Sequence, residues 1–391
     1  MTRALRLAAL LAAGLVGTAC AHVVPTTGVR PGAPADSASA DTAADSSTRG
    51  GTDSRRGRRF YTGKRHGSEA QFNPLSLVVN GGFDQLRTRG ADKHVFRRSY
   101  GVAATSVWRS VTRPDRAVAR YGWGRWVRDE LLPLSGKGSG GGQWVPNYQL
   151  HLLAGGMTTV RLEEWYLQHG ASHPLLLAAS TAYAWHALTE LVENGDRRGY
   201  NVDAVSDLLL FDAASILLFR SERVQHLFGD VLEMTTWSGQ PSLGLREATI
   251  ENVHQTTMLR APLPFTADWR AMTTFGGSFL VGLSRRAGTE HWVSLAGGWD
   301  PAENPVVDEA TGRKTVVLNA NAGAFWDRGG SLMASVVVRA RRQERVTLNV
   351  YPGVVRVLGR SPGLWAQWLD SGQLRFGVSS TLGLGVGLGP P

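Results

Sequence analysis

The sequence contains one cysteine and very few lysines. Cys20 is the only cysteine among 391 residues, so no disulfide can form within the chain. Lysine occurs only at Lys64, Lys93, Lys137 and Lys314, so arginine supplies almost all the positive charge behind a net charge of +10. That charge is dispersed and accompanies no recognisable DNA- or RNA-binding motif, so we expect no nucleic-acid partner.

Aromatic residues are missing from a long stretch near the N-terminus. From Ala21 to about Gly57 the chain consists mainly of Ala, Ser, Thr, Asp, Gly and Pro. Such a segment cannot bury enough apolar surface to offset the entropy lost on ordering. We therefore predict a flexible tether over residues 21–59 and a folded part that begins near Phe60.

Two strings that resemble catalytic motifs each lack an essential group. The loop SGKGSGGGQ contains Gly-Lys, but Gly138 stands where a nucleotide-binding P-loop needs Ser or Thr. GRSPG fits the G-x-S-x-G pattern of serine hydrolases, but Pro362 has no backbone N–H to donate to an oxyanion. We interpret both strings as turns or loops.

Residues 1–20, MTRALRLAALLAAGLVGTAC, have the features of an export signal. Arg3 and Arg6 precede an apolar run that is too short to be a stable membrane span. The end of this run looks like the lipobox of bacterial lipoproteins, although Gly17 replaces the usual leucine. The resemblance implies cleavage before Cys20 and lipid attached to it, and Ala21 in place of Asp implies the outer membrane. The alternative is an ordinary signal peptide cleaved after Ala19 or Ala21.

These features predict a localisation and a partner. We expect a lipid-anchored protein of the bacterial outer membrane that faces the periplasm, with membrane lipid bound through Cys20. Anionic lipid or lipopolysaccharide is the expected counter-charge for the arginines.

Three apolar segments carry most of the buried acids and histidines that we expect. They span residues 147–170, 173–194 and 201–219. Each is longer than a typical strand, contains no proline in its interior and ends at a turn signal, so all three predict helices. Asn201 is a natural N-cap for the third.

After Phe228 the apolar residues recur at every second position, as in strands. In residues 315–326 and 374–388, apolar side chains alternate with small or polar ones. Runs joined by Arg286-Ala287-Gly288 or Arg328-Gly329-Gly330 predict hairpins. Similar runs occur at 247–259, 270–284, 289–299, 330–341 and 344–351.

The two patterns together predict an α+β fold. We expect a membrane-associated helical region over residues 60–230, followed by an antiparallel β-domain over residues 231–391. About eight strands are enough to close a small β-barrel, and several are long enough to cross a bilayer. An open sheet packed on the helices would show the same alternation, so membrane insertion is an open alternative.

Five ionisable residues in the helical region are candidates for chemistry. His186, Glu190 and Glu193 occur at i, i+4 and i+7, so they share one face of the second predicted helix. Asp207 and Asp212 lie in the third, among apolar neighbours. Histidine and carboxylates on facing helices can bind a divalent metal, but this spacing matches neither the Glu-x-x-His nor the HExxH motif.

We therefore interpret these five residues as a structural network. His151 in the first helix and Asp203 in the third would join it, with Arg161 or Arg197 as charge partners, because unpaired buried carboxylates are costly. A catalytic or metal site and a ligand contact are the alternatives. No cofactor and no metal are predicted.

Residues from about Phe60 to Ser284 resemble an uncharacterised family of bacterial envelope proteins, a domain of unknown function. The strings that carry the resemblance are YTGKRHGSEAQFNPLSLVVNGGFDQLR, WVPNYQLHLLAGGM, DLLLFDAASILLF and HQTTMLRAPLPF. The resemblance implies a membrane-associated helical region followed by β-structure. It brings no activity and no site residue.

The favoured function is non-enzymatic: a structural, lipid-handling or assembly role at the outer membrane. The first alternative is an envelope enzyme that acts on lipid or glycan through His186, Glu190, Glu193, Asp207 and Asp212. A further alternative is a barrel that binds a small ligand and is closed by the helices.

The lipid anchor gives the first testable prediction. Cys20→Ala removes the sulfur that would carry lipid, so the variant should take up no labelled acyl chain and should accumulate as the unprocessed precursor. Metabolic labelling with a radioactive fatty acid checks this. Label that remains on the variant would contradict the lipoprotein hypothesis.

Overall fold

The computed structural model describes residues 59–87, 93–132, 144–308 and 313–390. Side chains are not described for Trp144 and for residues 301–317. The predicted export signal at 1–20, Cys20 and nearly all of the predicted tether at 21–59 lie outside these residues.

The helical elements precede the strands, and the predicted α+β class is confirmed. Three long predicted helices are present, at 144–168, 174–194 and 202–219. The elements in chain order are η1 (Gly67–Gln71), α2 (Pro74–Gly82), η2 (Asp84–Arg87), α3 (Tyr100–Thr112), α4 (Pro114–Tyr121), α5 (Trp123–Trp126), η3 (Val127–Leu131), η4 (Trp144–Gly155), α6 (Gly156–Gln168), α7 (Pro174–Asn194), α8 (Val202–Val205), η5 (Ser206–Phe211), α9 (Asp212–Phe219), α10 (Glu222–Gln225) and η6 (His226–Val231).

Two of the three long helices contain π-helical segments. The first begins as η4 and continues as α6, and the third consists of α8, η5 and α9 in succession. Asn201 caps the third helix as predicted, because its side chain accepts a hydrogen bond from the backbone of Asp203 at 3.3 Å. A π-helical turn holds one more residue than an α-helical turn and often marks a functional site. Both π segments carry residues of the predicted cluster.

The strands form one curved sheet, and the predicted barrel of about eight strands is wrong. The described residues contain thirteen strands in the order β1-β4-β5-β6-β7-β8-β9-β10-β11-β12-β13-β2-β3, which is not closed. All neighbours are antiparallel except β13 and β2. The strands are β1 (Thr235–Thr236), β2 (Ser242–Gly244), β3 (Thr249–Glu251), β4 (Thr256–Leu263), β5 (Thr266–Gly276), β6 (Phe279–Arg286), β7 (His291–Asp308), β8 (Arg313–Arg328), β9 (Ser331–Arg339), β10 (Glu344–Val350), β11 (Gly363–Leu369), β12 (Leu374–Ser379) and β13 (Gly385–Leu388).

Glycines explain two of the miscounted strands. Gly276 and Gly383 have φ angles of +98° and +71°, a region that side-chain-bearing residues rarely adopt. They turn the chain inside the runs 270–284 and 374–388, so each run is a hairpin and not one strand. The two predicted hairpins, β6–β7 and β8–β9, are confirmed.

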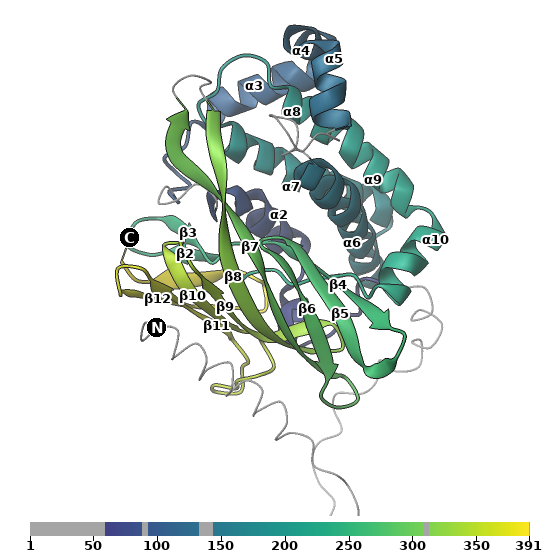
Figure 1. The fold of residues 1–391 in the computed structure, drawn as a ribbon, viewed down its shortest axis with the longest axis vertical. Coiled ribbons are helices and arrows are strands. Elements are labelled where there is room, and N and C mark those ends of the chain that lie inside the picture. The colour runs from purple at the N-terminus through teal and green to yellow at the C-terminus, as the bar shows by residue number, and fades with distance from the viewer. Residues whose placement is uncertain (1–58, 88–92, 133–143, 309–312, 391) are drawn as a thin grey trace, which may run out of the picture.

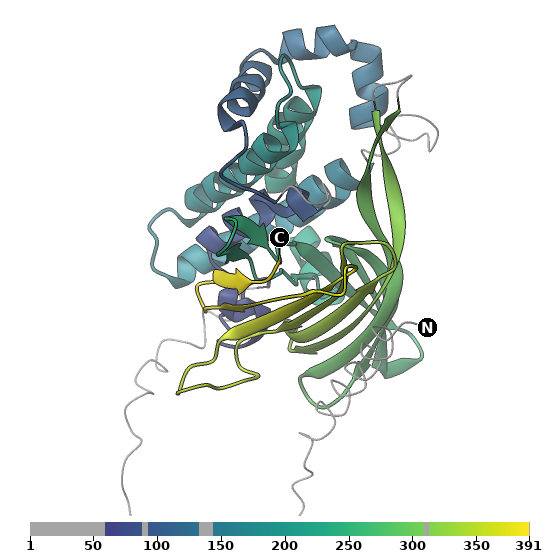
Figure 2. The same ribbon diagram turned by 90° about the vertical axis from the view of Figure 1, so that its left-hand side faces the viewer.

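The helices cover one side of the sheet. Figures 1 and 2 show the sheet as a curved trough, with α2, α6 and α7 packed on its inner side. Asn80 of α2 exchanges hydrogen bonds with the backbone of His254 beside β4, at 2.8 and 3.0 Å. A core that includes Met157 of α6, Phe219 of α9 and Phe275 of β5 joins the two layers.

On several strands, side chains alternate so that apolar residues face outward and polar residues face inward. On β12, Leu374, Phe376 and Val378 are exposed, whereas Arg375 and Ser379 between them are buried on the inner side. The same holds on β6 and β7. Their exposed outer residues include Phe279, Val281, Leu283, Leu295 and Trp299, and their buried inner residues include Ser284, Ser294 and Asp300.

The inner side of the sheet also holds buried ion pairs. Asp300 of β7 accepts hydrogen bonds from Arg87, Arg339 and Arg342, at 3.0 Å from Arg339 Nε and 3.2 Å from an Arg342 amino group. Arg260 of β4 pairs with Asp327 of β8, and both side chains are almost completely buried. The interior between the helices and the sheet thus contains buried ion pairs beside an apolar cluster around Met258, Leu280 and Phe325.

The Arg260–Asp327 pair gives a stability prediction. Arg260→Met would leave the Asp327 carboxylate buried without its charge partner, so unfolding should become easier by about 3–5 kcal/mol. The control is Arg328→Met, which removes an exposed pair with Glu290 and should cost less than about 1 kcal/mol. Denaturant unfolding measures both, and equal losses would contradict the prediction.

Candidate functional site

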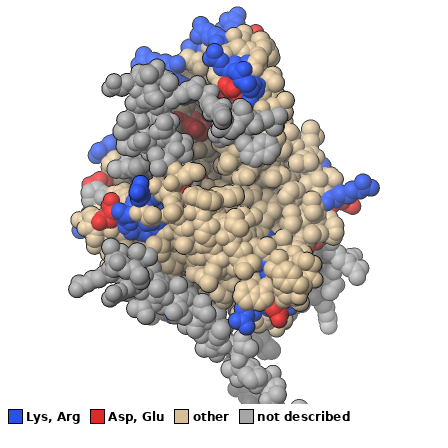
Figure 3. All heavy atoms as spheres, viewed as in Figure 1, with Lys and Arg blue, Asp and Glu red and all other residues tan. Residues whose placement is uncertain are grey.

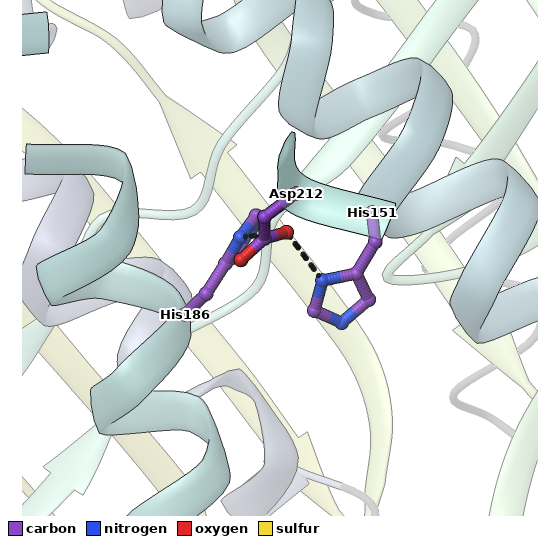
Figure 4. A group of neighbouring side chains, drawn as sticks. All are labelled: His151, His186 and Asp212. Carbon is purple, nitrogen blue, oxygen red and sulfur yellow. Dashed lines mark hydrogen bonds and ion pairs between the residues drawn. The ribbon is translucent and has the colours of Figure 1, made fainter. Parts of the chain in front are cut away.

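The predicted site residues meet where η4, α7 and the η5–α9 helix face one another. Asp212 lies between two histidines from the other helices (Figure 4). Its Oδ1 is 2.9 Å from Nδ1 of His151 and 2.7 Å from Nδ1 of His186. The His151 contact is a hydrogen bond. The His186 contact is equally short, but its angles do not meet those of a hydrogen bond, so Nδ1 of His186 has no hydrogen-bond partner.

A second group of side chains shares His151. Nε2 of His151 is 3.5 Å from Oδ2 of Asp207. One atom each from His151, Glu190 and Asp207 lie within 4.8 Å of one another, and so do one atom each from His151, His186 and Asp212. His151 is therefore the centre of the site. Its position in an apolar helix was the available signal, but sequence spacing pointed to His186 instead.

The cluster borders a cavity of about 90 Å³ between the helices and the sheet. His151, His186 and Asp207 line it from the helical side, and Gln255 and Thr257 line it near and on β4. The remaining predicted residue, Glu193, lines the same cavity, as does Asp203. All five predicted residues thus lie in one region, with Glu190 fully buried next to the cavity.

The arginines predicted to neutralise the cluster lie elsewhere. Arg161 pairs with Glu69 at 3.4 Å, and Arg197 donates to the Asn201 side chain at 2.9 Å. Within the described parts of the chain, no lysine or arginine forms an ion pair with Glu190, Asp207 or Asp212.

Several buried oxygens of the cluster also accept no hydrogen bond. They are Oε2 of Glu190, Oδ1 of Asp207 and Oδ2 of Asp212. These three oxygens lack the partners that a structural network would give them, and the network stays a prediction.

Burial and like charge act differently on the three carboxyl groups. Burial and the neighbouring acids Asp207 and Asp203 raise the pKa of Glu190 well above the ordinary carboxyl range. Burial, Asp203 and Glu193 do the same to the pKa of Asp207. Burial also favours neutral Asp212, but His186 and His151 outweigh it and lower the pKa of Asp212 to about 2.

The two histidines differ as well. Burial opposes protonation of His151, but the hydrogen bond and charge of Asp212 outweigh it and raise the His151 pKa. For His186, burial dominates and lowers the pKa. At neutral pH the site thus contains an Asp212–His151 pair beside neutral His186 and two carboxyl groups that resist ionisation.

A glycine allows His186 to approach the first helix. A Cβ atom on Gly155 of η4 would lie 3.1 Å from Cε1 of His186, which is tighter than an ordinary contact. The absence of a side chain at Gly155 thus lets the imidazole of His186 pack against η4.

Comparisons with protein-family models, curated proteins and solved structures found no match to this chain. The resemblance to an envelope family therefore stays a prediction. Among the helices of the described residues, none is both long and apolar enough to span a membrane.

The pKa values of Asp207 and Asp212 are shifted in opposite directions, so replacing these residues should change stability in opposite directions. Asp207 favours its proton in the folded state, so its ionisation opposes folding increasingly as pH rises above the ordinary carboxyl pKa. Asp212 is stabilised as a carboxylate, so its contribution is present above that pKa and is lost as pH falls toward 2. At pH 7, with metal chelated, Asp207→Asn should raise the midpoint of thermal unfolding and Asp212→Asn should lower it.

The stabilisation by Asp207→Asn should shrink as pH falls from 8 toward 4. Calorimetry over this range measures both effects. If both variants lose stability equally at pH 7, the structural-network hypothesis is restored.

Proposed function

We propose that this protein is a lipid-anchored protein of the bacterial outer membrane, and that the outer face of its curved sheet contacts lipid acyl chains. A structural, lipid-handling or envelope-assembly role follows from that position. The observation that carries the proposal is the band of exposed apolar side chains on the outer face, while buried polar and charged side chains lie on the covered inner side beside an apolar cluster.

This orientation is the reverse of what water favours. A sheet with one face in water normally buries its apolar side chains and exposes its polar ones. Here Leu283 and Leu295 lie opposite each other on neighbouring strands and are about half exposed, at 48% and 59%. Apolar-outward, polar-inward alternation is typical of strands that face lipid. Figure 3 displays the same face as a continuous uncharged surface with charged residues toward its edges.

Aromatic residues at both ends of this apolar band support the proposal. Trp269 of β5 is paired with Arg285 of β6, whose guanidinium lies 5.7 Å from the indole ring. At the other end of β6, Phe279 stacks on Trp299 of β7, with ring centroids 6.4 Å apart. Tryptophan at both ends of an apolar band, with arginine beside one of them, matches the belts of proteins at membrane interfaces.

One observation favours the enzymatic alternative. The buried histidines and carboxylates reach a cavity without an arginine partner among the described residues, which a purely structural network would not require. An envelope enzyme that acts on lipid or glycan is therefore the second candidate. The ligand-binding barrel is dropped, because the sheet is not closed.

The lipid contact can be tested on the outer face. Leu295→Arg should destabilise the full-length protein in lipid vesicles by about 2–4 kcal/mol, because arginine on a lipid-facing strand is costly near the bilayer midplane. Leu217→Arg is the control, since Leu217 is equally apolar and 74% exposed, but lies on helix α9. It should change the unfolding free energy by less than about 0.5 kcal/mol.

Denaturant unfolding in vesicles measures both variants. Indistinguishable stabilities, together with a wild-type protein that stays monomeric in buffer without lipid or detergent, would disprove the lipid contact.

A further inference from the structure

We propose that His151, Glu190 and Asp207 bind a divalent metal ion of the zinc class at the inner end of the cavity. The inference concerns the helical cluster and does not depend on the lipid contact of the sheet.

The separation of the ligand atoms supports this assignment. Nε2 of His151 and Oδ2 of Asp207 are 3.5 Å apart, too far for a hydrogen bond of normal length. Two ligands at ~2.1 Å from a tetrahedral ion are separated by about 3.4 Å. A carboxylate oxygen of Glu190 is the third ligand atom, and one ligand atom from each of the three residues lies within 4.8 Å of the other two. The three residues come from three helices, η4, α7 and η5, so the fold holds them facing one another.

Asp212 has a different role, that of a partner behind the ligand. It is 2.9 Å from Nδ1 of His151 and 2.7 Å from Nδ1 of His186, which are hydrogen-bond lengths and shorter than the spacing of ligands around an ion. A carboxylate that accepts a hydrogen bond from one N–H of a histidine leaves the other nitrogen free to bind metal, and this is the usual outer arrangement at such sites. The Asp212 contact thus directs Nε2 of His151 toward Asp207.

Two unsatisfied oxygens point to a missing positive charge. Oε2 of Glu190 and Oδ1 of Asp207 are buried and accept no hydrogen bond. A buried carboxylate without a donor or a charge partner is strongly destabilising. A divalent cation would supply the charge that both carboxylates lack, and histidine with carboxylates suits zinc, iron or manganese. Three protein ligands also leave a coordination position toward the cavity, as in catalytic and not structural zinc sites.

The test uses the full-length protein after chelation and dialysis. Isothermal titration with ZnCl₂ and elemental analysis should find one ion per chain. Asp207→Asn and Glu190→Gln should each weaken zinc binding by about 100-fold or more. Asp212→Asn should weaken it by about 10–100-fold, the range for outer partners of ligands. His169→Gln is the control, because His169 is exposed at the end of α6 and should leave the affinity unchanged.

A spectroscopic measurement separates ligand loss from unfolding. Co²⁺ in place of zinc should give the visible absorption of a four- or five-coordinate site, and Asp207→Asn should abolish it while far-ultraviolet circular dichroism stays unchanged. Wild-type protein that binds no zinc below millimolar concentration would overturn the proposal and leave shared protons as the neutralising charge. Binding that persists in both Asp207→Asn and Glu190→Gln would overturn it equally.

Discussion

Charged side chains buried between the helices and the sheet are tolerated only where opposite charges meet, and this requirement governs the whole interior. Because many inward-facing side chains of the sheet are polar or charged, they need partners in the interior. Asp300 receives three arginines, two of them from the β9–β10 region and one from η2. Lys93 and Arg375 likewise satisfy Glu251 and Glu344. These contacts fix the helical layer against the sheet.

The need for charge pairing also distinguishes the candidate site from the rest of the interior. Around Asp300 the positive charges match or exceed the negative ones, whereas around Glu190 and Asp207 the acids outnumber the bases. Two clusters of similar burial in one molecule therefore differ in their degree of neutralisation. Among the described residues, these two carboxyl groups thus stand out from the other buried acids because no arginine or lysine pairs with them.

Sequence periodicity predicted the fold class and the long helices, because those signals are local. The cap at Asn201 and the alternation along Leu374–Ser379 were visible in the same way. Strand count failed because Gly276 and Gly383 fit an alternating pattern equally well as strand or turn residues, and only their backbone angles decide. The direction of the alternation also cannot be inferred from one strand, since it depends on which face the helices cover.

The site was predictable in composition but not in arrangement. His186, Glu190 and Glu193 share a helix face by spacing alone, and the structure places them together. The contacts of His151 with Asp207 and Asp212 join separate helices. They depend on two π-helical segments, η4 and η5, which no residue pattern in the sequence predicts. The arginine partners were wrong because Arg161 and Arg197 are occupied by nearer groups, Glu69 and Asn201.

The parallel pairing of β13 with β2 has a consequence for folding. Ser242 aligns with Gly385, so β13 links β12, its neighbour in sequence, to β2, which lies far from it in sequence. Contacts so distant in sequence form late, because a long loop must close first. In a nascent chain the edges of β2 and β12 thus stay unpaired until β13 has been synthesised. An unpaired strand edge can pair with another chain, so this order of synthesis leaves a period in which the sheet is open to aggregation.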